Sequence, residues 1–503
     1  MKFDNRFVRE LPGEPTAAPG ARPVRGALYS RVQPTPVAAP RWIAVNQALA
    51  AEIDAEPDSP AFLQAMAGNH LLPGMEPIAS NYGGHQFGHW AGQLGDGRAI
   101  SLGEAIGRDG ARYELQLKGA GPTPYSRHAD GRAVLRSSLR EYVLSEAMYA
   151  LGVPTTRALS LVATGEPVVR DMFYDGRPQQ EPCAIVCRVA PSFIRFGHFE
   201  LPAARGDTAL LERLIDFTLD RDFPQLRGDR SRWFVEIAER TARLMVDWMR
   251  LGFVHGVMNT DNFSILGLTI DYGPFGWLEN VDPLWTPNTT DAEGRRYAYG
   301  RQPQIAQWNL SALAHALTSM VDGDALAAGL DHYGNTFSAG YLAAMRNKLG
   351  LADAHDDDLD LVRELMAWME AAECDFTLTF RALSDSRPGD LSARHFEALS
   401  YNVQKFSRAQ SRIESWLSRY AQRGDAPDRK VRMDGANPRI VPRNYLLQQA
   451  IDAAEQGDLG VLNELLKALE RPFADQPQFE HLAAKRPEWA RSRAGCSMLS
   501  CSS

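Results

Sequence analysis

The stretch HGVMNTDNFSILGLTIDYG, from His255 to Gly273, sets the expected fold of this chain. It follows a long amphipathic segment and supplies Asn262 and Asp271 from two adjacent loop ends. Amide and carboxylate oxygens are hard ligands that suit Mg²⁺, and bound Mg²⁺ neutralises nucleotide phosphates. The stretch therefore predicts Asn262 and Asp271 as metal ligands beside a nucleotide.

The same stretch departs from the catalytic loop of a phosphotransferase at one position. Small-molecule kinases carry His-Gly-Asp and an asparagine five residues later, and Asn262 occupies that asparagine position. The aspartate position holds Val257, and a carboxylate stands instead at Asp261. Loss of the loop aspartate is the usual sign of a non-catalytic scaffold. Because the metal-binding groups are retained, including Asp271 in an Asp-Tyr-Gly motif, we expect an enzyme.

A glycine-rich segment lies upstream, GQLGDGR, with Gly95, Gly97 and Arg98. Glycines let a backbone approach a phosphate closely and present its N–H groups, and the arginine adds a permanent cation. The segment therefore favours a nucleotide-binding loop. A hairpin turn of the Asp-Gly type is the alternative.

A lysine and a glutamate follow in the order that kinases use. Lys118 ends an alternating strand, YELQLKG, and the next helical segment offers Glu141 and Glu146. In kinases a strand lysine grips the nucleotide phosphates and a helix carboxylate holds it in place. We expect Glu141 to pair with Lys118. Taken singly, each residue is as well explained by solvent exposure.

Two arginines seven residues apart form the last candidate feature. Arg188 and Arg195 lie in CRVAPSFIRFGHFE, where a kinase would connect its lobes. Two guanidiniums there could clamp a polyphosphate, because arginine gives bidentate geometry to phosphate oxygens. Ordinary surface salt bridges are the alternative.

The order of strands and helices predicts an α+β, two-lobed protein-kinase-like fold. Residues 1–74 are expected to form an extension, of which the Pro- and Ala-rich first 40 wrap the surface as an arm. Residues 75–190 form a β-rich lobe around one helix at 135–151, and residues 191–425 form a helical lobe with the catalytic and metal loops. Residues 426–503 form a C-terminal helical extension with a polar, partly disordered tail. The expected strands are 98–104, 113–119, 158–164, 166–174 and 183–189, and the main expected helices are 232–253, 325–350 and 358–383.

Composition narrows the partners and the compartment. With 44% hydrophobic and 23% charged residues the chain can bury a sizeable core. A net charge of −8 argues against nucleic acid as the main partner. The sequence contains no apolar run long enough to span a membrane and starts with a polar segment, so we expect a cytoplasmic protein.

The cysteines and histidines suggest no further site. Five cysteines in 503 residues form no disulfide framework, so we expect mostly free thiols; Cys374 is expected inside a helix. His85 and His89 are four apart, as in a helical zinc pair, but the flanking glycines oppose a helix and the required glutamate is missing. Structural histidines are the better interpretation.

Taken together, these motifs resemble the selenoprotein O (SelO/YdiU) family of protein adenylyltransferases. The resemblance covers nearly the whole chain. It rests on GGHQFGHWAGQLGDGRA, QLKGAGPTPYSRHADGRAVLRSSLREYVLSEAM, SFIRFGHFE, HGVMNTDNFSILGLTIDYGPFGWLE, PNTTDAEGRRYAYGRQP and NPRIVPRNY, together with shorter matches.

The resemblance implies a kinase-like fold that binds ATP in reverse orientation and transfers AMP to Ser, Thr or Tyr hydroxyls of proteins, with Mg²⁺ or Mn²⁺ as cofactor. By the same resemblance Asp261 is the catalytic acceptor, Glu141 orients Lys118, and Asn262 and Asp271 are metal ligands. The implied nucleotide contacts are Gly95, Gly97, Arg98, Lys118, Asp130, Gly131, Arg188, Arg195 and Asp271. UTP remains an alternative nucleotide, and we expect a monomer. The alternatives are a phosphotransferase, favoured by the His-Gly-x5-Asn pattern but opposed by Val257, and a non-catalytic nucleotide-binding scaffold.

The chain departs from some bacterial relatives in its cysteines. Those relatives pair a cysteine in the loop after Asp-Tyr-Gly with a C-terminal cysteine. Here that loop reads DPLWTPNTTDAEG and contains none, although Cys501 stands in the tail. The sequence therefore argues against a loop-to-tail disulfide and leaves a bond between Cys496 and Cys501 open.

Overall fold

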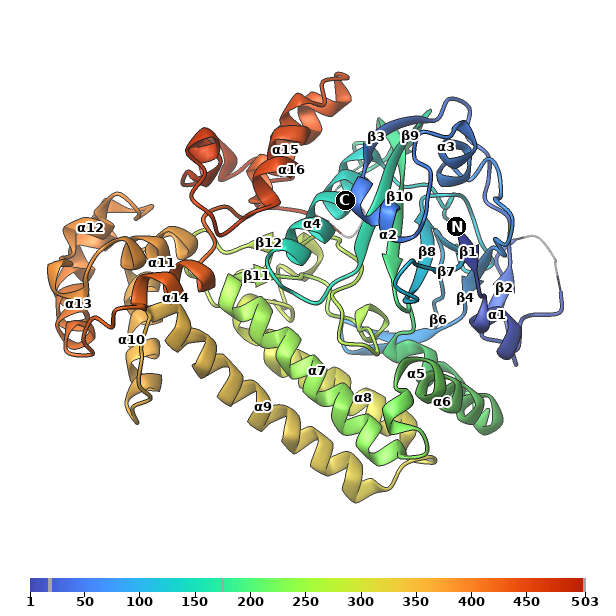
Figure 1. Cartoon of the computed structure of the whole chain (residues 1–503), viewed down its shortest axis with the longest axis horizontal. Helices are drawn as coiled ribbons and strands as arrows, with labels where there is room; N and C mark the ends of the chain where they lie inside the picture. The colour runs from blue at the N-terminus through green and yellow to red at the C-terminus, as the bar shows by residue number, and fades with distance from the viewer. Residues whose placement is uncertain (17–19, 173–175, 501–503) are drawn as a thin grey trace.

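The computed structural model describes residues 1–16, 20–172 and 176–500. An antiparallel sheet forms one end of the molecule and helices form most of the rest (Figure 1). The α+β class predicted from the sequence is confirmed.

The main sheet contains eight strands within the described residues, in the order β2-β4-β7-β8-β10-β9-β3, with β1 paired to β7. Its strands are β1 (Lys2–Phe3), β2 (Tyr29–Arg31), β3 (Arg41–Val45), β4 (Ile78–Ser80), β7 (Ala99–Ile106), β8 (Arg112–Lys118), β9 (Arg157–Arg170) and β10 (Gln179–Ala190). Every pair is antiparallel. Lys118 lies opposite Ala99 on β7 and Val186 on β10, so the central strand β8 brings it to the functional end of the sheet.

The predicted strands at 98–104, 113–119 and 183–189 correspond to β7, β8 and β10. The strands predicted separately at 158–164 and 166–174 form one long strand, β9, and β-pairing with β10 continues past Gly165. The backbone at Gly165 has φ of +80°, a conformation that glycine adopts without strain, so this residue does not end the strand. Residues 173 and 174 of that prediction lie outside the described residues.

Helices cover both faces of the sheet. On one face, Leu139 and Val143 of α4 (Leu135–Ala150) are completely buried in a core shared with β9 and β10. On the other, Leu49 of α2 (Gln47–Glu52) and Phe62 of α3 (Pro60–Met66) pack with the opposite side of the same strands. The predicted helix at 135–151 is therefore present and packs on β9 and β10, and β10 is the neighbour of the strand that carries Lys118.

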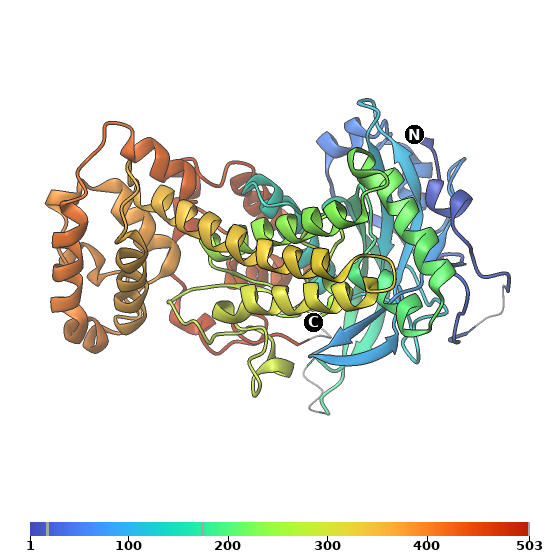
Figure 2. The same cartoon turned by 90° about the horizontal axis from the view of Figure 1, so that it is seen from below.

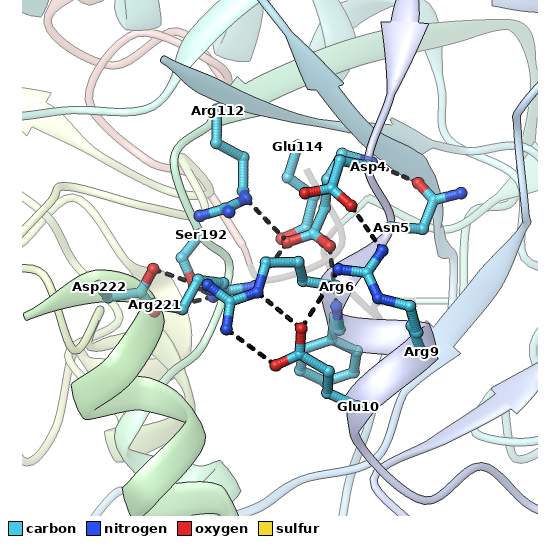
Figure 3. Close-up of polar contacts among 12 residues, drawn as sticks. Asp4, Asn5, Arg6, Arg9, Glu10, Arg112, Glu114, Ser192, Arg221 and Asp222 are labelled. Atoms are coloured by element: carbon cyan, nitrogen blue, oxygen red, sulfur yellow. Dashed lines mark hydrogen bonds and ion pairs between the residues drawn. The ribbon is translucent and has the colours of Figure 1, made fainter. Parts of the chain in front are cut away.

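The N-terminal segment is part of the sheet, which the sequence did not predict. Strands β1, β2 and β3 pair with β7, β4 and β9, and α1 (Arg6–Glu10) lies against the rim. Figure 3 shows the polar cluster that anchors it, with Arg6, Glu10 and Arg221 among the labelled residues. In this cluster the amide of Phe7 donates to Glu104 at 2.8 Å, and Arg221 donates to the same carboxylate at 2.7 Å. The prolines of this segment do not prevent short strands. The N-terminal segment is therefore part of the sheet and not only an arm on the surface.

The helical part is built around three long helices that lie side by side in Figure 1, α7 (Arg230–Leu251), α8 (Gln302–Leu317) and α9 (Gly323–Leu349). Asp229 caps the start of α7, and Gly252 ends it in the left-handed conformation. The remaining helices are α5 (Phe196–Ala204), α6 (Thr208–Asp222), α10 (Asp358–Ala371), α11 (Phe376–Asp385), α12 (Arg394–Glu397), α13 (Val403–Ala421), α14 (Arg429–Ala436), α15 (Asn444–Glu455) and α16 (Gly460–Leu469). Figure 2 shows residues of the 358–436 region, in orange, at the end of the molecule opposite the sheet.

The single helix predicted over 358–383 is wrong. Two helices, α10 and α11, are separated by a break that contains Cys374. Glu373 has a left-handed backbone with φ of 48°, and Asp375 accepts the amide of Leu378 as the cap of the second helix. Cys374 therefore forms an isolated bridge with Ser400 instead of lying in a helix.

The described part of the C-terminal tail, residues 496–500, contacts the rest of the protein, whereas residues 501–503 of the tail predicted to be partly disordered lie outside the described residues. Leu499 is 1% exposed, and its amide donates to Pro287 O at 2.9 Å. Cys183, Cys187, Cys374 and Cys496 are free and buried; Cys501, and with it a Cys496–Cys501 bond, lies outside the described residues. No helix within the described ranges is long and apolar enough to cross a membrane.

Candidate functional site

One cavity of about 1140 Å³ lies between the sheet and the loops that precede α8. Every site residue predicted from the sequence lines it except Glu141, which lies behind Lys118. The predicted residues on its wall are Gly95, Gly97, Arg98, Lys118, Asp130, Gly131, Arg188, Arg195, Asp261, Asn262 and Asp271. Residues up to 176 positions apart in the chain are thus gathered around a single space.

The glycine-rich segment is a loop, and the hairpin alternative is wrong. It connects β6 (His89–Gln93), which pairs with β5 (Gly83–Gln86), to β7 of the main sheet. Gly95 has φ of +75°, and a Cβ there would lie 2.4 Å from the Tyr125 ring. Only glycine fits this position, which keeps the backbone against the cavity wall.

Lys118 forms the ion pair that the sequence predicted. Its Nζ lies 2.6 Å from Glu141 Oε2, and Glu141, on α4, is 1% exposed. Burial lowers the pKa of Lys118, against the opposing charge of Glu141. The carboxylate therefore keeps an ammonium group in place at the cavity wall, where an anionic ligand would meet it.

Asp271 is held by both predicted arginines. Arg188 donates to Asp271 Oδ1 and Arg195 donates to Oδ2, while Lys118 lies 4.0 Å from Oδ1. Burial alone would raise the pKa of Asp271, but Arg195, Arg188 and Lys118 outweigh it and hold that pKa well below its usual range. The arginines are buried, at 1% and 2% exposure, so the surface-salt-bridge alternative is wrong.

Asp261 occupies a short 3-10 turn, η2 (Thr260–Asn262), and faces the cavity. Its Oδ1 is buried with no hydrogen-bond partner among the described residues, and Oδ2 accepts a long bond of 3.4 Å from Gln86. Burial is the main reason that its pKa is raised to about 7. A carboxylate with this pKa can take up a proton near neutral pH.

His255 connects the two ends of the motif HGVMNTDNFSILGLTIDYG. Its Nε2 lies 2.9 Å from Ile270 O, and its ring stacks on Trp248 with centroids 5.1 Å apart. The histidine thus connects the loop that carries Asp261 to the segment that carries Asp271. Val257 lines the cavity where kinases have an aspartate.

Asp130 and Gly131 also line the cavity, together with Arg98. Arg170 binds both oxygens of Asp130, at 2.9 and 2.7 Å. Burial lowers the pKa of Arg98, and Glu141 and Asp271 oppose that shift. Arg98 and Arg170 therefore add two further arginine side chains to the lining.

Sequence reasoning missed several residues that shape the cavity. Asp96 is 3% exposed and accepts bonds from Ser80 N, Tyr82 and Gln116. Gln116 also accepts a bond from Arg188. Asp96 lies inside the glycine-rich motif, where an Asp-Gly turn was sufficient to explain an aspartate. The alternating pattern of β8 predicted only which face of the strand carries Gln116, not its hydrogen-bond partners. The bonds from Gln116 to Asp96 and from Arg188 to Gln116 join residues 20 and 72 positions apart. Local sequence patterns do not reveal such contacts.

The residues fit a hard cation held jointly with phosphates. Asn262 Nδ2 donates to Val257 O at 3.0 Å, so Oδ1 is the atom of this amide that can ligate a cation. Asp271 supplies carboxylate oxygens from the same wall. The described part of the chain contains no group of three or more His, Cys, Asp or Glu suited to a metal. Two protein oxygens suffice for Mg²⁺, which usually takes its other ligands from phosphates and water.

The histidines of GGHQFGHW lie on a β-hairpin, so the helical zinc pair is wrong. His85 on β5 lies opposite Trp90 on β6, and its Nδ1 is 2.6 Å from Glu200. The amide of His85 donates to Thr260 Oγ1 at 2.7 Å. The hairpin therefore supports the loop that carries Asp261.

The C-terminal tail is hydrogen-bonded to the loop DPLWTPNTTDAEG, which contains no cysteine. Thr289 donates to Leu499 O through its amide at 2.7 Å and through its hydroxyl at 2.9 Å. The neighbouring Thr290 lines the cavity. Hydrogen bonds thus make a loop-to-tail connection that needs no disulfide.

Comparison with known proteins extends the likeness to almost the whole chain. The family described as protein adenylyltransferase SelO matches residues 21–470. A protein nucleotidyltransferase YdiU of Xanthomonas campestris pv. campestris (strain B100) is 60% identical over 516 residues, covering 100% of this chain and 99% of its own. Proteins with the same description from Azoarcus sp. (strain BH72) and Aromatoleum aromaticum are 59% and 57% identical, with the same coverage.

Proposed function

The chain belongs to the SelO family of protein adenylyltransferases and is a nucleotidyltransferase; on this premise we propose that it transfers AMP from ATP to Ser, Thr or Tyr hydroxyls of proteins. The observation that carries the proposal is the cavity in which Lys118, Arg188 and Arg195 surround Asp271 while Asp261 lies at the same wall. Three cations suit a triphosphate, and the carboxylate of Asp261 suits an acceptor proton.

In the proposed reaction the acceptor hydroxyl oxygen bonds to the α-phosphorus of ATP. The bond from that phosphorus to the oxygen bridging the β-phosphorus breaks, and pyrophosphate leaves with the bonding electrons. Asp261 takes the acceptor proton, while Arg188 and Arg195 bind the β- and γ-phosphates, where negative charge develops. A divalent cation at Asn262 and Asp271, Mg²⁺ or Mn²⁺, would supply further neutralisation of the phosphates.

The proposal includes the roles of the remaining residues. Gly95, Gly97, Arg98, Asp130 and Gly131 contact the nucleotide, and Glu141 orients Lys118. We propose a kinase-like arrangement with lobes at 75–190 and 191–425, an N-terminal extension at 1–74 and a C-terminal extension at 426–503, in a cytoplasmic monomer. The sheet flanked by α4 and the helical region around α7 support this arrangement.

The test uses the full chain with Mg²⁺, a mixture of proteins as acceptors, and ATP labelled at either the α- or the γ-phosphate. We expect α-label in protein and none from γ. Label from γ alone would establish a phosphotransferase, and label from neither, with ATP still bound, would indicate a non-catalytic scaffold. The same assay with α-labelled UTP decides between the two nucleotides.

A further inference from the structure

A groove continues from the nucleotide cavity along the surface. Phe87 and Thr290 line both spaces, so the groove begins beside the wall that carries Asp261. Its far side is formed by the 287–301 loop and α8, with Arg296 and Trp308 on its lining. This loop belongs to the motif PNTTDAEGRRYAYGRQP, to which the proposed reaction assigns no role.

The guanidinium of Arg296 is closely surrounded in this groove. The Trp308 ring centroid lies 4.7 Å from Cζ, and Tyr297 also contacts the side chain. Gly88 approaches so closely that a Cβ there would lie 3.1 Å from Cζ. Gly88 also has φ of +86°, so this hairpin turn suits glycine on two counts. Clamped in this way, Arg296 has little rotamer freedom left to lose on binding.

The same guanidinium has an unused edge. Arg296 Nε and Nη2 are enclosed without a hydrogen-bond partner within residues 1–16, 20–172 and 176–500. Elsewhere in this chain that pair of nitrogens grips a carboxylate: Arg6 binds Glu10 with it, and Arg136 binds Glu181. Enclosed and unpaired donors are costly, which indicates a missing partner.

Asp291 and Glu293 line the groove, and neither forms an ion pair with Arg296 among the described residues. The two oxygens of Asp291 accept the backbone amides of Arg296 and Tyr297 at 2.9 and 2.7 Å. Trp308 is 36% exposed beside the guanidinium. Tryptophan and arginine are both residue types enriched at binding hot spots.

We propose that the groove receives the acceptor polypeptide and that Arg296 binds an aspartate or glutamate side chain flanking the modified hydroxyl. This inference rests on the proposed function. It makes Arg296 a specificity-determining residue, because a carboxylate matches the planar fork and a neutral or basic side chain does not. The Trp308 ring and the hairpin tip would shift slightly to admit the carboxylate between them.

The test is a peptide library with one fixed Ser, Thr or Tyr and randomised flanks, incubated with the full chain, Mg²⁺ and α-labelled ATP. We expect enrichment of Asp and Glu at one flanking position by roughly tenfold, the size of one charge-assisted hydrogen bond. Arg296→Gln and Arg296→Lys should both lose that enrichment, because lysine retains the charge but not the fork. Arg295→Gln, at the exposed neighbour outside the groove, should retain it.

Each outcome decides a different question. Labelling without acidic preference, or a preference that survives Arg296→Gln, would overturn this inference and leave the transfer reaction intact. Absence of α-label from every peptide and every protein would overturn the transfer reaction and this inference with it. Melting temperatures of the variants verify that each one is folded.

Discussion

Asp271 and Arg195 form a buried ion pair in the cavity, and in the proposed reaction each has a different partner. Arg195 donates to Asp271 Oδ2 and, through the same nitrogen, to Asp261 O at 2.9 Å. When a nucleotide and its cation bind, Asp271 would turn to the cation and Arg195 to the phosphates. Without nucleotide, the carboxylate of Asp271 and the guanidinium of Arg195 therefore stabilise each other.

Replacing Asp271 by asparagine should therefore affect both stability and activity. Arg188 and Arg195 would lose their shared counter-charge while remaining buried, which costs roughly 3 kcal/mol of unfolding free energy. We also expect loss of α-label incorporation, because a ligand of the cation is gone. Urea unfolding and the labelling assay measure the two effects. Unchanged stability would show that water in the cavity replaces the carboxylate.

The Lys118–Glu141 pair can be tested by a double-mutant cycle. Glu141 also accepts a bond of 3.2 Å from Arg188, so Glu141→Gln loosens two cations at once. We expect Lys118→Met and Glu141→Gln each to weaken ATP binding, and the double variant to be little worse than Glu141→Gln alone. Contacting residues are not additive, with coupling of about 0.5–3 kcal/mol. Additive losses measured by titration calorimetry would refute the orienting role of Glu141.

Glu114 predicts how stability depends on pH. It lies opposite Glu104 across β7 and β8, in the cluster of Figure 3. Burial, and then the charge of Glu104, raise its pKa to about 7 from 4.5. Because the folded pKa lies above the unfolded one, this contribution to stability is complete below pH 4.5 and is lost as pH rises through 7.

Glu114→Gln should remove that dependence. The unfolding free energy of the variant, relative to that of the original chain, should rise by up to about 3 kcal/mol when the pH is raised from 5 to 8. This figure follows from about 1.4 kcal/mol for each unit of pKa difference. Glu104→Gln is the contrasting variant: it weakens the pairing with Arg221 and should destabilise at both pH values. Equal unfolding free energies for Glu114→Gln and the original chain at pH 8 would contradict the assignment.

The sequence predicted which residues line the site better than it predicted the contacts between them. Lys118 and Glu141 follow from a strand and a helix near each other in the chain, and the spacing from Asn262 to Asp271 follows from one motif. The pairing of Arg188 with Asp271 joins residues 83 apart, one on β10 and the other on a segment outside the sheet. No periodicity marks such a contact.

Fold boundaries failed where short-range signals compete. Pro-rich residues near the N-terminus still form edge strands, because partners in β4, β7 and β9 supply the pairing. Across 358–383 the apolar periodicity continued while Asp375 started a new helix, so the cap outweighed the pattern. The tail reads as polar, yet one apolar residue, Leu499, is enough to anchor it.

Leu499 also connects the tail to the 287–301 loop. Truncation after Met498 removes the carbonyl that accepts two bonds from Thr289 and the amide that donates to Pro287. The Thr289 amide should then exchange with solvent at least about fivefold faster, because one backbone bond contributes about 1 kcal/mol or more to local protection. The Asn262 amide, which donates to Asn259 O at 2.9 Å, should keep its exchange rate. Met498→Ala, at a residue 43% exposed, is the matched control and should change neither amide. Equal Thr289 exchange in the truncated and full chains would mean that the 287–301 loop holds its shape at the cavity without the tail.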